Sequence, residues 1–319
     1  MADIHYLDQP LETEALLKRL CPPVRNWFKD QFPDFTRPQK LAIPAIIEQE
    51  HLLLCSPTGS GKTLTAFLSI IDQLVRRALD GKLEKRVYCV YISPIKALAN
   101  DIQRNLLGPL KEISERYLPD RAQEIKVGLR TGDTPQSERQ KMLRNPPHIL
   151  ITTPESLAIA ITSPRFQPIV SEVEYMIIDE LHSLVPTKRG VHLALTLSYL
   201  DTLLTRPVQR IGISATMEPL ETVAEFLVAS DDQESRTAAT KVCIAKVSGS
   251  RELDLDILIT DPKFSDLSVM KIFDKNIEAV ADLIAAHNTT LVFANTRKMT
   301  ENIVLKLRPY LGDLVAGHH

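Results

Sequence analysis

The sequence is poor in cysteine and has no long apolar runs. Only four cysteines occur among 319 residues, and no two of them form a CxxC pair. This pattern suggests neither a zinc site nor a disulfide framework, and it favours reduced, mostly buried thiols. No apolar run approaches the roughly 18 residues that a membrane span requires, and the acidic N-terminus lacks the bases and apolar stretch of a signal peptide. We therefore expect a cytoplasmic protein.

The sequence also lacks an excess of charge of either sign. Its 38 Lys and Arg residues against 40 Asp and Glu residues give a formal net charge of −2. A broad basic field of the kind that drives sequence-independent nucleic-acid binding is therefore excluded. Any contact with a polynucleotide must be local, made by a few side chains, backbone amides and helix N-termini. The length and the 44% of hydrophobic residues predict two globular domains, or one and a part.

Short apolar runs alternate with longer helical patterns along the first two thirds of the chain. The apolar runs, which predict buried strands, lie at residues 51–55, 87–93, 148–153, 175–179 and 209–214. The helical patterns lie at residues 64–79, 97–107 and 135–143. This alternation is typical of an α/β fold with a doubly wound, mostly parallel sheet and helices on both faces. We therefore predict one α/β domain over residues 1–230.

A polar stretch, SDDQESRTAATK, lacks apolar periodicity and predicts a linker over residues 231–250. Strand and helix patterns then resume at residues 253–259, 271–286, 290–294, 298–307 and 313–316. These patterns amount to about half of a second α/β domain, over residues 251–319. Half of a doubly wound domain leaves an apolar sheet edge uncovered, so we expect this region to fold poorly.

The segment SPTGSGKT, at residues 56–63, follows a predicted strand and opens a predicted helix, which is the context of a phosphate-binding loop. Lys62 would reach the β and γ phosphates, Thr63 would place its hydroxyl on Mg²⁺, and the helix N-terminus adds favourable partial charge. Ser56 replaces the Gly or Ala that usually opens the pattern, and it is also small. The other residues that would bind the phosphates are Thr58, Gly59, Ser60 and Gly61.

The segment DELH, at residues 179–182, places two carboxylates directly after an apolar strand. Such a pair is costly unless its charge is compensated, and a Mg²⁺ ion on nucleotide phosphates compensates it. Asp179 would hold the metal, and Glu180 would orient the water that attacks the γ-phosphate. Alone, an acidic pair at a helix start is equally consistent with a helix cap. Together with Lys62, the two acids predict a nucleotide-hydrolysing site.

The ordered set SPTGSGKT, SPIKALA, TTPESL, DELH and SAT resembles superfamily 2 helicases of the DExH-box type, whose core is two RecA-like domains. Within that superfamily the chain is most similar to the N-terminal portion of the Lhr, or large helicase-related, proteins. That likeness rests on RTGDT at residues 130–134, TKRGVHLAL at 187–195 and LVFANTR at 291–297. The resemblance implies a RecA-like P-loop NTPase domain followed by about half of a second one. It also implies ATP-driven translocation on single-stranded DNA with 3′ to 5′ polarity.

The resemblance also assigns roles in nucleotide selection and in coupling. Thr36 and Gln39, in FTRPQ, resemble the motif that reads the adenine edge and so selects ATP. A surface residue at the start of a helix is an equally consistent interpretation of Gln39. Ser214 and Thr216 of SAT would couple hydrolysis to strand movement through hydrogen bonds to the DELH segment, by way of His182; a plain turn is the alternative.

The resemblance places a nucleic-acid track on segments that each follow a strand and precede a helix. This geometry presents hydroxyls and helix N-terminal amides to successive phosphates, without sequence readout. Taken singly, each segment is equally consistent with a capped helix start. Single-stranded DNA is the expected partner and RNA is possible, because backbone contacts discriminate weakly. The assigned residues are Ser93, Pro94, Lys96, Arg130, Gly132, Asp133, Thr153, Pro154, Glu155, Asn295, Thr296 and Arg297.

Lys188 and Arg189, in the TKRG segment, are open to two interpretations. They could contact phosphate, or they could be two solvated bases in a loop.

The 319 residues contain no segment of the type QxxGRxxR, which supplies the arginines that neutralise the transferred phosphoryl group in this superfamily. Loss of an arginine finger lowers the rate by about 10³ to 10⁵. We therefore predict that this chain binds ATP with Mg²⁺ and hydrolyses it weakly. The alternative to a translocase is an ATP-gated nucleic-acid clamp, or an RNA helicase fragment, with little turnover. A GTPase switch or a small-molecule kinase is disfavoured, since no NKxD segment is present.

Overall fold

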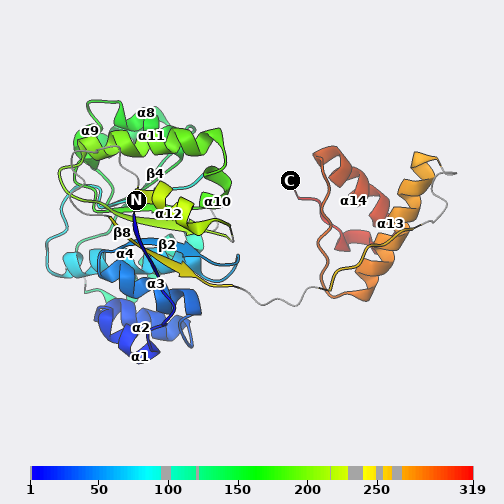
Figure 1. Ribbon diagram of the computed structural model, residues 1–319, viewed down its shortest axis with the longest axis horizontal. Helices are drawn as coiled ribbons and strands as arrows, with labels where there is room; N and C mark the ends of the chain where they lie inside the picture. Colours follow the sequence, from blue (N-terminus) through cyan, green and yellow to red (C-terminus); the bar gives the residue numbers. More distant parts are fainter. Residues whose placement is uncertain are drawn as a thin grey trace. The chain divides into compact units, whose positions relative to one another are not determined.

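The computed structural model describes residues 2–94, 102–119, 122–215, 217–228, 240–248, 254–260 and 268–318. The chain divides into two compact units, residues 1–250 and 251–319. The first unit contains a sheet covered by helices, and the described part of the second contains two α-helices and a short 3₁₀ turn (Figure 1).

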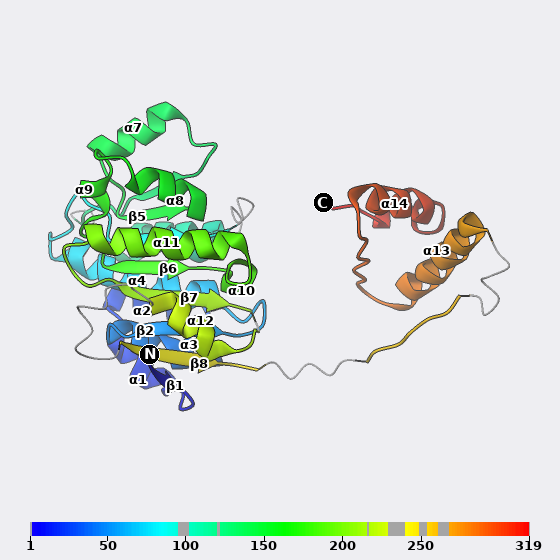
Figure 2. The same cartoon turned by 45° about the horizontal axis from the view of Figure 1, so that its top comes forward.

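The first unit is built on one eight-stranded sheet in the order β1-β8-β2-β7-β6-β3-β5-β4 (Figure 2). All the neighbouring strands pair in parallel. The predicted α/β class with a doubly wound parallel sheet is therefore confirmed for this unit. The strands are β1 (Asp3–Tyr6), β2 (His51–Cys55), β3 (Cys89–Ile92), β4 (Val127–Arg130), β5 (Ile149–Thr152), β6 (Tyr175–Ile178), β7 (Gln209–Ser214) and β8 (Lys241–Lys246).

Helices cover both faces of this sheet, so successive residues of a central strand enter different apolar clusters. In β2, Leu52 and Leu54 pack into one cluster and Leu53 and Cys55 into the other. This two-sided burial explains why the strands are continuous apolar runs rather than alternating ones. The first cluster includes residues of α1 (Thr13–Arg19), α2 (Pro22–Gln31), α3 (Arg37–Ile47), α4 (Lys62–Leu79), the π-helical turn η1 (Gln103–Leu107) and α6 (Gly108–Tyr117). The second includes residues of α7 (Gln136–Arg144), α8 (Pro154–Ile161), α9 (Gln167–Val170), α10 (Leu181–Leu184), α11 (Lys188–Leu203) and α12 (Leu220–Val228).

One expected boundary does not hold, because the predicted linker over residues 231–250 contains strand β8. This strand lies between β1 and β2 in the sheet, and its four central residues are buried. Its register pairs Asp3 with Lys241 and His51 with Val242. The strand forms because its partners lie about 200 residues earlier in the chain, and a local pattern carries no sign of them. The first unit accordingly extends past residue 230.

The second unit contains α13 (Val269–Ala286), α14 (Arg297–Leu311) and the short 3₁₀ turn η3 (Gly312–Leu314). Both helices were predicted. The strands expected at 253–259, 290–294 and 313–316 are absent from the described part of these ranges. A strand requires a neighbour for its backbone hydrogen bonds, and the described residues of this unit supply none. None of the helices in the described ranges is long and apolar enough to cross a membrane.

Candidate functional site

The strand order gathers the sequence motifs into two groups at the carboxyl edge of the sheet. Strands β2, β7 and β6 are neighbours, and they lead into SPTGSGKT, SAT and DELH. Strands β3, β5 and β4 follow, and they lead into SPIKALA, TTPESL and RTGDT. The chain passes from β2 to β3 over two positions that β7 and β6 fill later, and ligands of open α/β sheets bind where the strand order reverses in this way. The nucleotide motifs and the track motifs therefore occupy adjoining halves of one edge.

The phosphate-binding loop packs against the segment FTRPQ. Gly61 has a φ of 88°, and a Cβ atom on it would lie 3.3 Å from Gln39 Nε2. Thr36 Oγ1 donates a hydrogen bond to Ser60 O at 3.1 Å, and Thr36 N donates one to Gln39 Oε1 at 2.8 Å. Gln39 is buried, so its interpretation as a plain surface residue is wrong. Glycine at position 61 permits both the left-handed backbone and the close approach of the Gln39 amide.

Lys62, the first residue of α4, folds its side chain back over the loop. Its Nζ donates hydrogen bonds to Ser56 O at 2.6 Å and to Pro57 O at 2.8 Å. Burial lowers the pKa of Lys62, while the carboxylates of Glu180 and Asp179 act in the opposite direction. The charges of both acids of DELH therefore act on Lys62.

Asp179 is a buried carboxylate with fixed hydrogen bonds. Tyr91 Oη donates to its Oδ2 at 2.5 Å, and Glu180 N donates to its Oδ1 at 2.8 Å. Burial raises the pKa of Asp179 to about 6, so its negative charge is only partly compensated. Glu180 adopts a φ of 53°, a left-handed conformation that costs a non-glycine residue on the order of 1–3 kcal/mol. Tyr91 was not predicted, because nothing in the apolar run at residues 87–93 distinguishes it.

The donor set fits Mg²⁺ held jointly with nucleotide phosphates. Mg²⁺ prefers oxygen ligands and is usually bound by one or two carboxylates together with phosphates and water. Thr63, in the first turn of α4, supplies a hydroxyl, and Asp179, directly after β6, supplies an under-compensated carboxylate at the same edge of the sheet. Within the described ranges, no group of three or more His, Cys, Asp and Glu side chains could hold a metal by itself. A site of this kind therefore depends on the nucleotide for its remaining ligands.

His182 connects DELH to the SAT segment. Its Nδ1 lies 3.2 Å from Glu180 Oε2 and also 3.2 Å from Ala215 N. One ring nitrogen cannot donate to Glu180 while it accepts from Ala215, so only one of the two contacts is a hydrogen bond at a time. Ser214 Oγ instead donates to Met217 Sδ at 3.0 Å. The expected link from the Ser214 hydroxyl is therefore replaced by one from the Ala215 backbone.

The segments after β3 and β5 are joined by Arg189, which opens α11 with Lys188. Arg189 Nε donates to Glu155 Oε1 at 2.7 Å, and its Nη2 donates to Pro94 O at 2.9 Å. Arg189 is thus not the freely solvated base that one interpretation of the sequence expected. Thr153 Oγ1 accepts a hydrogen bond from Ser156 N at 3.3 Å and caps α8.

The RTGDT loop after β4 is held by an arginine that the sequence did not single out. Arg139, in α7, donates to Thr134 O and Gly132 O, both at 2.9 Å. Arg130 lies with its guanidinium carbon 4.6 Å from the centre of the Phe166 ring. Burial, and then the charge of Arg139, lower the pKa of Arg130. Asp133 is exposed at the tip of the loop.

The remaining predicted residues lie elsewhere. Asn295, Thr296 and Arg297 belong to the second unit, where Thr296 Oγ1 accepts a hydrogen bond from Met299 N at 3.1 Å and caps α14. This cap accounts for Thr296 without a ligand. The other two predicted residues, Lys96 and Thr216, lie outside the described residues.

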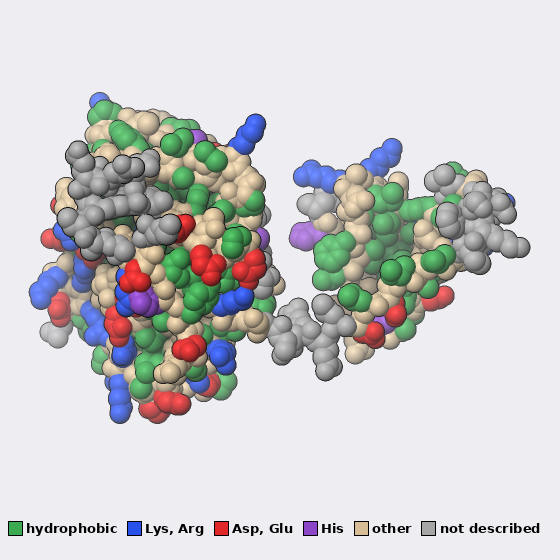
Figure 3. Space-filling view, viewed as in Figure 1, with side chains coloured by type: hydrophobic (Ala, Val, Ile, Leu, Met, Phe, Trp, Pro, Cys, Tyr) green, Lys and Arg blue, Asp and Glu red, His purple; other side chains and the backbone are tan. Residues whose placement is uncertain are grey.

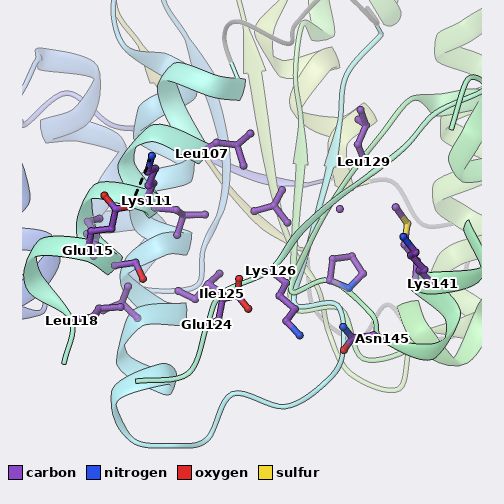
Figure 4. A pocket seen from close by; sticks show the side chains of 18 of the residues that line it. Leu107, Lys111, Glu115, Leu118, Glu124, Ile125, Lys126, Leu129, Lys141 and Asn145 are labelled. Carbon is purple, nitrogen blue, oxygen red and sulfur yellow. Dashed lines mark ion pairs between the residues drawn. The ribbon is translucent and has the colours of Figure 1, made fainter. Parts of the chain in front are cut away.

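A pocket of about 790 Å³ lies at the β4 edge of the sheet, away from these motifs. Figure 4 shows Leu107 and Lys111 on one side of it and Lys141 and Asn145 on the other. None of the predicted site residues lines it. The pocket is therefore separate from the carboxyl-edge site.

Comparison with known sequences gives a consistent family match. A profile of the DEAD/DEAH box helicase family matches residues 36–226. The chain is 42% identical to the ATP-dependent helicase Lhr-Core of Methanocaldococcus jannaschii, covering 100% of this chain and 37% of that protein. It is 38% identical to the Lhr helicase/uracil glycosylase of Escherichia coli, covering 94% of this chain and 20% of that protein. The chain thus spans well under half the length of these relatives.

Solved structures agree on the fold. The Mycobacterium smegmatis helicase Lhr bound to ssDNA and AMP-PNP is 39% identical, with a TM-score of 0.77 over 94% of this chain and 37% of that one. The DUF1998 helicase MrfA bound to DNA and AMPPNP is 21% identical, with a TM-score of 0.68 over 96% of this chain and 39% of that one. At that identity MrfA supports the fold alone. The RecA-like helicase fold predicted from the motifs is confirmed.

Proposed function

Because the chain belongs to the DEAD/DEAH box helicase family, we propose that it is the ATP-binding portion of an Lhr-type helicase, an ATP-driven motor on single-stranded nucleic acid. One observation carries the proposal. The strand order β2-β7-β6 places Lys62, the two acids of DELH and the SAT segment at one edge, with the Lys62 pKa responding to both acids. Lysine, carboxylates and a phosphate-binding loop in this arrangement favour hydrolysis of a nucleoside triphosphate.

In the proposed mechanism, Thr36 and Gln39 read the adenine edge, and the amides of residues 58–61 cradle the phosphates. Lys62 exchanges the carbonyls of its own loop for phosphate oxygens. Thr63 and Asp179 would hold Mg²⁺, which supplies charge neutralisation on the phosphates when bound. Glu180 orients the attacking water and accepts its proton. His182 then couples Glu180 to the backbone of the SAT segment, because its Nδ1 can form a hydrogen bond with either Glu180 or Ala215 N but not with both at once.

Single-stranded DNA is the proposed track. The described track residues of the first unit stand at or directly after the ends of β3, β5 and β4, at one edge of the sheet, and this shared edge would let them contact successive phosphates. The ssDNA bound to the M. smegmatis Lhr structure supports this assignment. RNA is the second candidate, because contacts of this kind read the backbone and discriminate weakly without a 2′-hydroxyl contact.

The alternative function is an ATP-gated clamp with little turnover. It is favoured by the lack of a QxxGRxxR segment within the 319 residues. Both functions predict nucleotide binding, and they differ in the rate at which phosphate is released.

The test is steady-state phosphate release by the 319-residue chain with Mg²⁺ and ATP, with and without single-stranded DNA or RNA. Near-background release with retained AMP-PNP binding supports an ATP-binding portion that lacks its arginines. Turnover that Lys62→Ala abolishes would overturn the missing-arginine argument, and the stimulating polynucleotide would identify the track. Failure to bind AMP-PNP would overturn the proposed function itself. Glu180→Gln is the matched variant, since it should spare nucleotide binding and remove any turnover.

A further inference from the structure

Arg189 bridges two segments that lie far from it in the sequence. Its Nη2 donates to the carbonyl of Pro94, 95 residues away, and its Nε donates to the carboxylate of Glu155, 34 residues away. Pro94 follows strand β3 and Glu155 opens helix α8, which follows β5. Strands β3 and β5 are neighbours in the sheet. One guanidinium therefore spans the two adjacent segments assigned to the track.

The position of Arg189 is set by the segment that follows DELH. The next residue, Gly190, has no room for a side chain, since a Cβ atom there would lie 2.4 Å from Leu184 O. Thr187 Oγ1 donates to the same carbonyl at 2.8 Å. The first turn of α11 is thereby pressed against the end of α10, which begins directly after Glu180. Arg189 thus extends from the DELH side of the site toward the track.

Stability alone does not account for this arrangement. The side chains of Arg189 and Glu155 are 44% and 49% exposed, and an exposed ion pair contributes about 0–1 kcal/mol to folding. Although burial raises the pKa of Glu155, the hydrogen bond from Arg189 and its charge lower it below the usual value, so the pair is charged at neutral pH. A guanidinium is a planar fork whose Nε and Nη2 direct hydrogen bonds to two separated acceptors, whereas the ammonium group of lysine is a compact point charge without fixed donor directions.

We propose that Arg189 is a positioning residue for nucleic-acid binding: it holds the segments at Pro94 and Glu155 in register with each other and with the helix after DELH. In this role it does not touch the polynucleotide. The inference rests on the proposed function, because it concerns the same track. It differs from a direct phosphate contact by Arg189 in the effects expected from substitution.

The test measures the affinity of the full 319-residue chain for a fluorescent single-stranded oligodeoxynucleotide over a series of salt concentrations. Arg189→Lys keeps the charge and loses the fork, so affinity should fall about fivefold while the slope of log affinity against log salt is unchanged. Glu155→Gln should weaken binding to a similar extent. Simple electrostatics predicts the opposite sign, since removing a carboxylate beside a polyanion strengthens binding. The double variant should be no weaker than either single variant.

Controls separate positioning from charge and from folding. Lys188→Gln removes the neighbouring charge and calibrates the effect of one lost cation on the salt slope. AMP-PNP affinity and the melting temperature should stay near those of the unsubstituted chain, because the pair is exposed. A lysine variant with full affinity, a salt slope reduced by about one in Arg189→Ala, or additive effects in the double variant would each overturn the inference. An unsubstituted chain that binds AMP-PNP but no oligonucleotide would overturn both this inference and the proposed track.

Discussion

The two units of the chain contain similar apolar patterns and bury them very differently. In the first unit, the apolar residues of β2 are buried on both faces of an eight-stranded sheet. In the second unit, Ile257 and Phe293 are 95% and 90% exposed, and hydrophobic side chains are visible across its drawn face (Figure 3). The buried apolar cluster of its described part consists of Ile277, Ala281 and Leu307. A strand-like sequence is therefore buried only where neighbouring strands and helices exist to cover it.

Separating the two units should give the largest effect. Residues 1–250 alone should unfold in one cooperative transition and retain the AMP-PNP affinity of the full chain. Residues 251–319 alone should show no cooperative transition, because so small an apolar cluster does not offset the loss of chain entropy. Circular dichroism melts and titration calorimetry measure the two results. A sharp melt of the shorter piece would remove the contrast between the units.

The first unit should be sensitive to loss of a single ionic cluster at the amino end of its sheet. The nearly buried carboxylate of Glu174 accepts hydrogen bonds from Arg77 at 2.9 and 2.6 Å, from Arg86 at 2.5 Å and from Arg206 at 3.1 Å. Glu174→Gln should lower the free energy of unfolding by about 3 kcal/mol, because it leaves charged groups without their partner. The matched control Glu84→Gln removes an exposed partner of Arg86 and should cost less than about 1 kcal/mol. Urea denaturation measures the free energy of unfolding of both variants. Equal losses would show that Glu174 is not the central carboxylate of this ionic cluster.

The first unit should also lose stability in mild acid. Burial lowers the pKa of His148 from its ordinary 6.5 to about 4, and its Nδ1 accepts a hydrogen bond from Lys126 N at 2.9 Å. As the pH falls, His148 is protonated in the unfolded chain before it is protonated in the folded chain. Its neutral form therefore contributes fully to the free energy of unfolding above pH 6.5, and this contribution is lost as the pH falls toward 4. A shift of this size corresponds to about 3 kcal/mol.

His148→Asn keeps an acceptor for Lys126 and removes the titrating ring. The pH dependence of the unfolding free energy should become shallower between pH 6.5 and 4 in this variant. His51, whose pKa is also lowered to about 4 by burial, accounts for a similar part of the slope. An unchanged slope would show that His148 is not the group responsible.

The smallest predicted effect is confined to α14 in the second unit. Leu307 is 1% exposed and Leu305, two residues earlier, is 62% exposed. Leu307→Ala should lower the hydrogen-exchange protection of the α14 amides, because it removes a member of the small buried cluster, and Leu305→Ala should leave this protection nearly unchanged. Hydrogen exchange of the α14 amides reports both. Equal protection in the two variants would mean that this cluster does not hold the unit together.

The sequence points to the residues proposed for the chemistry of the site more directly than to the residues that hold them in place. Lys62, Asp179 and Glu180 stand out because they lie in segments that directly follow apolar runs, and that local context is visible in the sequence. Tyr91, Arg139 and Arg189 were missed or underestimated. Tyr91 and Arg189 act on residues tens of positions away, and a single sequence carries no sign of such pairs. Arg139 acts on the nearby backbone carbonyls of Thr134 and Gly132, which no residue type in the sequence marks as acceptors. Strand β8 was missed for the same reason, since its partners β1 and β2 lie near the start of the chain.

The sequence by itself determined the central strands of the first unit and the residue types that follow them, because both depend on interactions among residues close together in the chain. The tertiary structure decided which of those ends are neighbours. In sequence the strands run β2, β3, β4, β5, β6, β7, whereas in the sheet they run β2, β7, β6, β3, β5, β4. This order separates the nucleotide motifs from the track motifs and lets Arg189 reach both Pro94 and Glu155. It arises from long-range packing of strands and helices, which no window of the sequence contains.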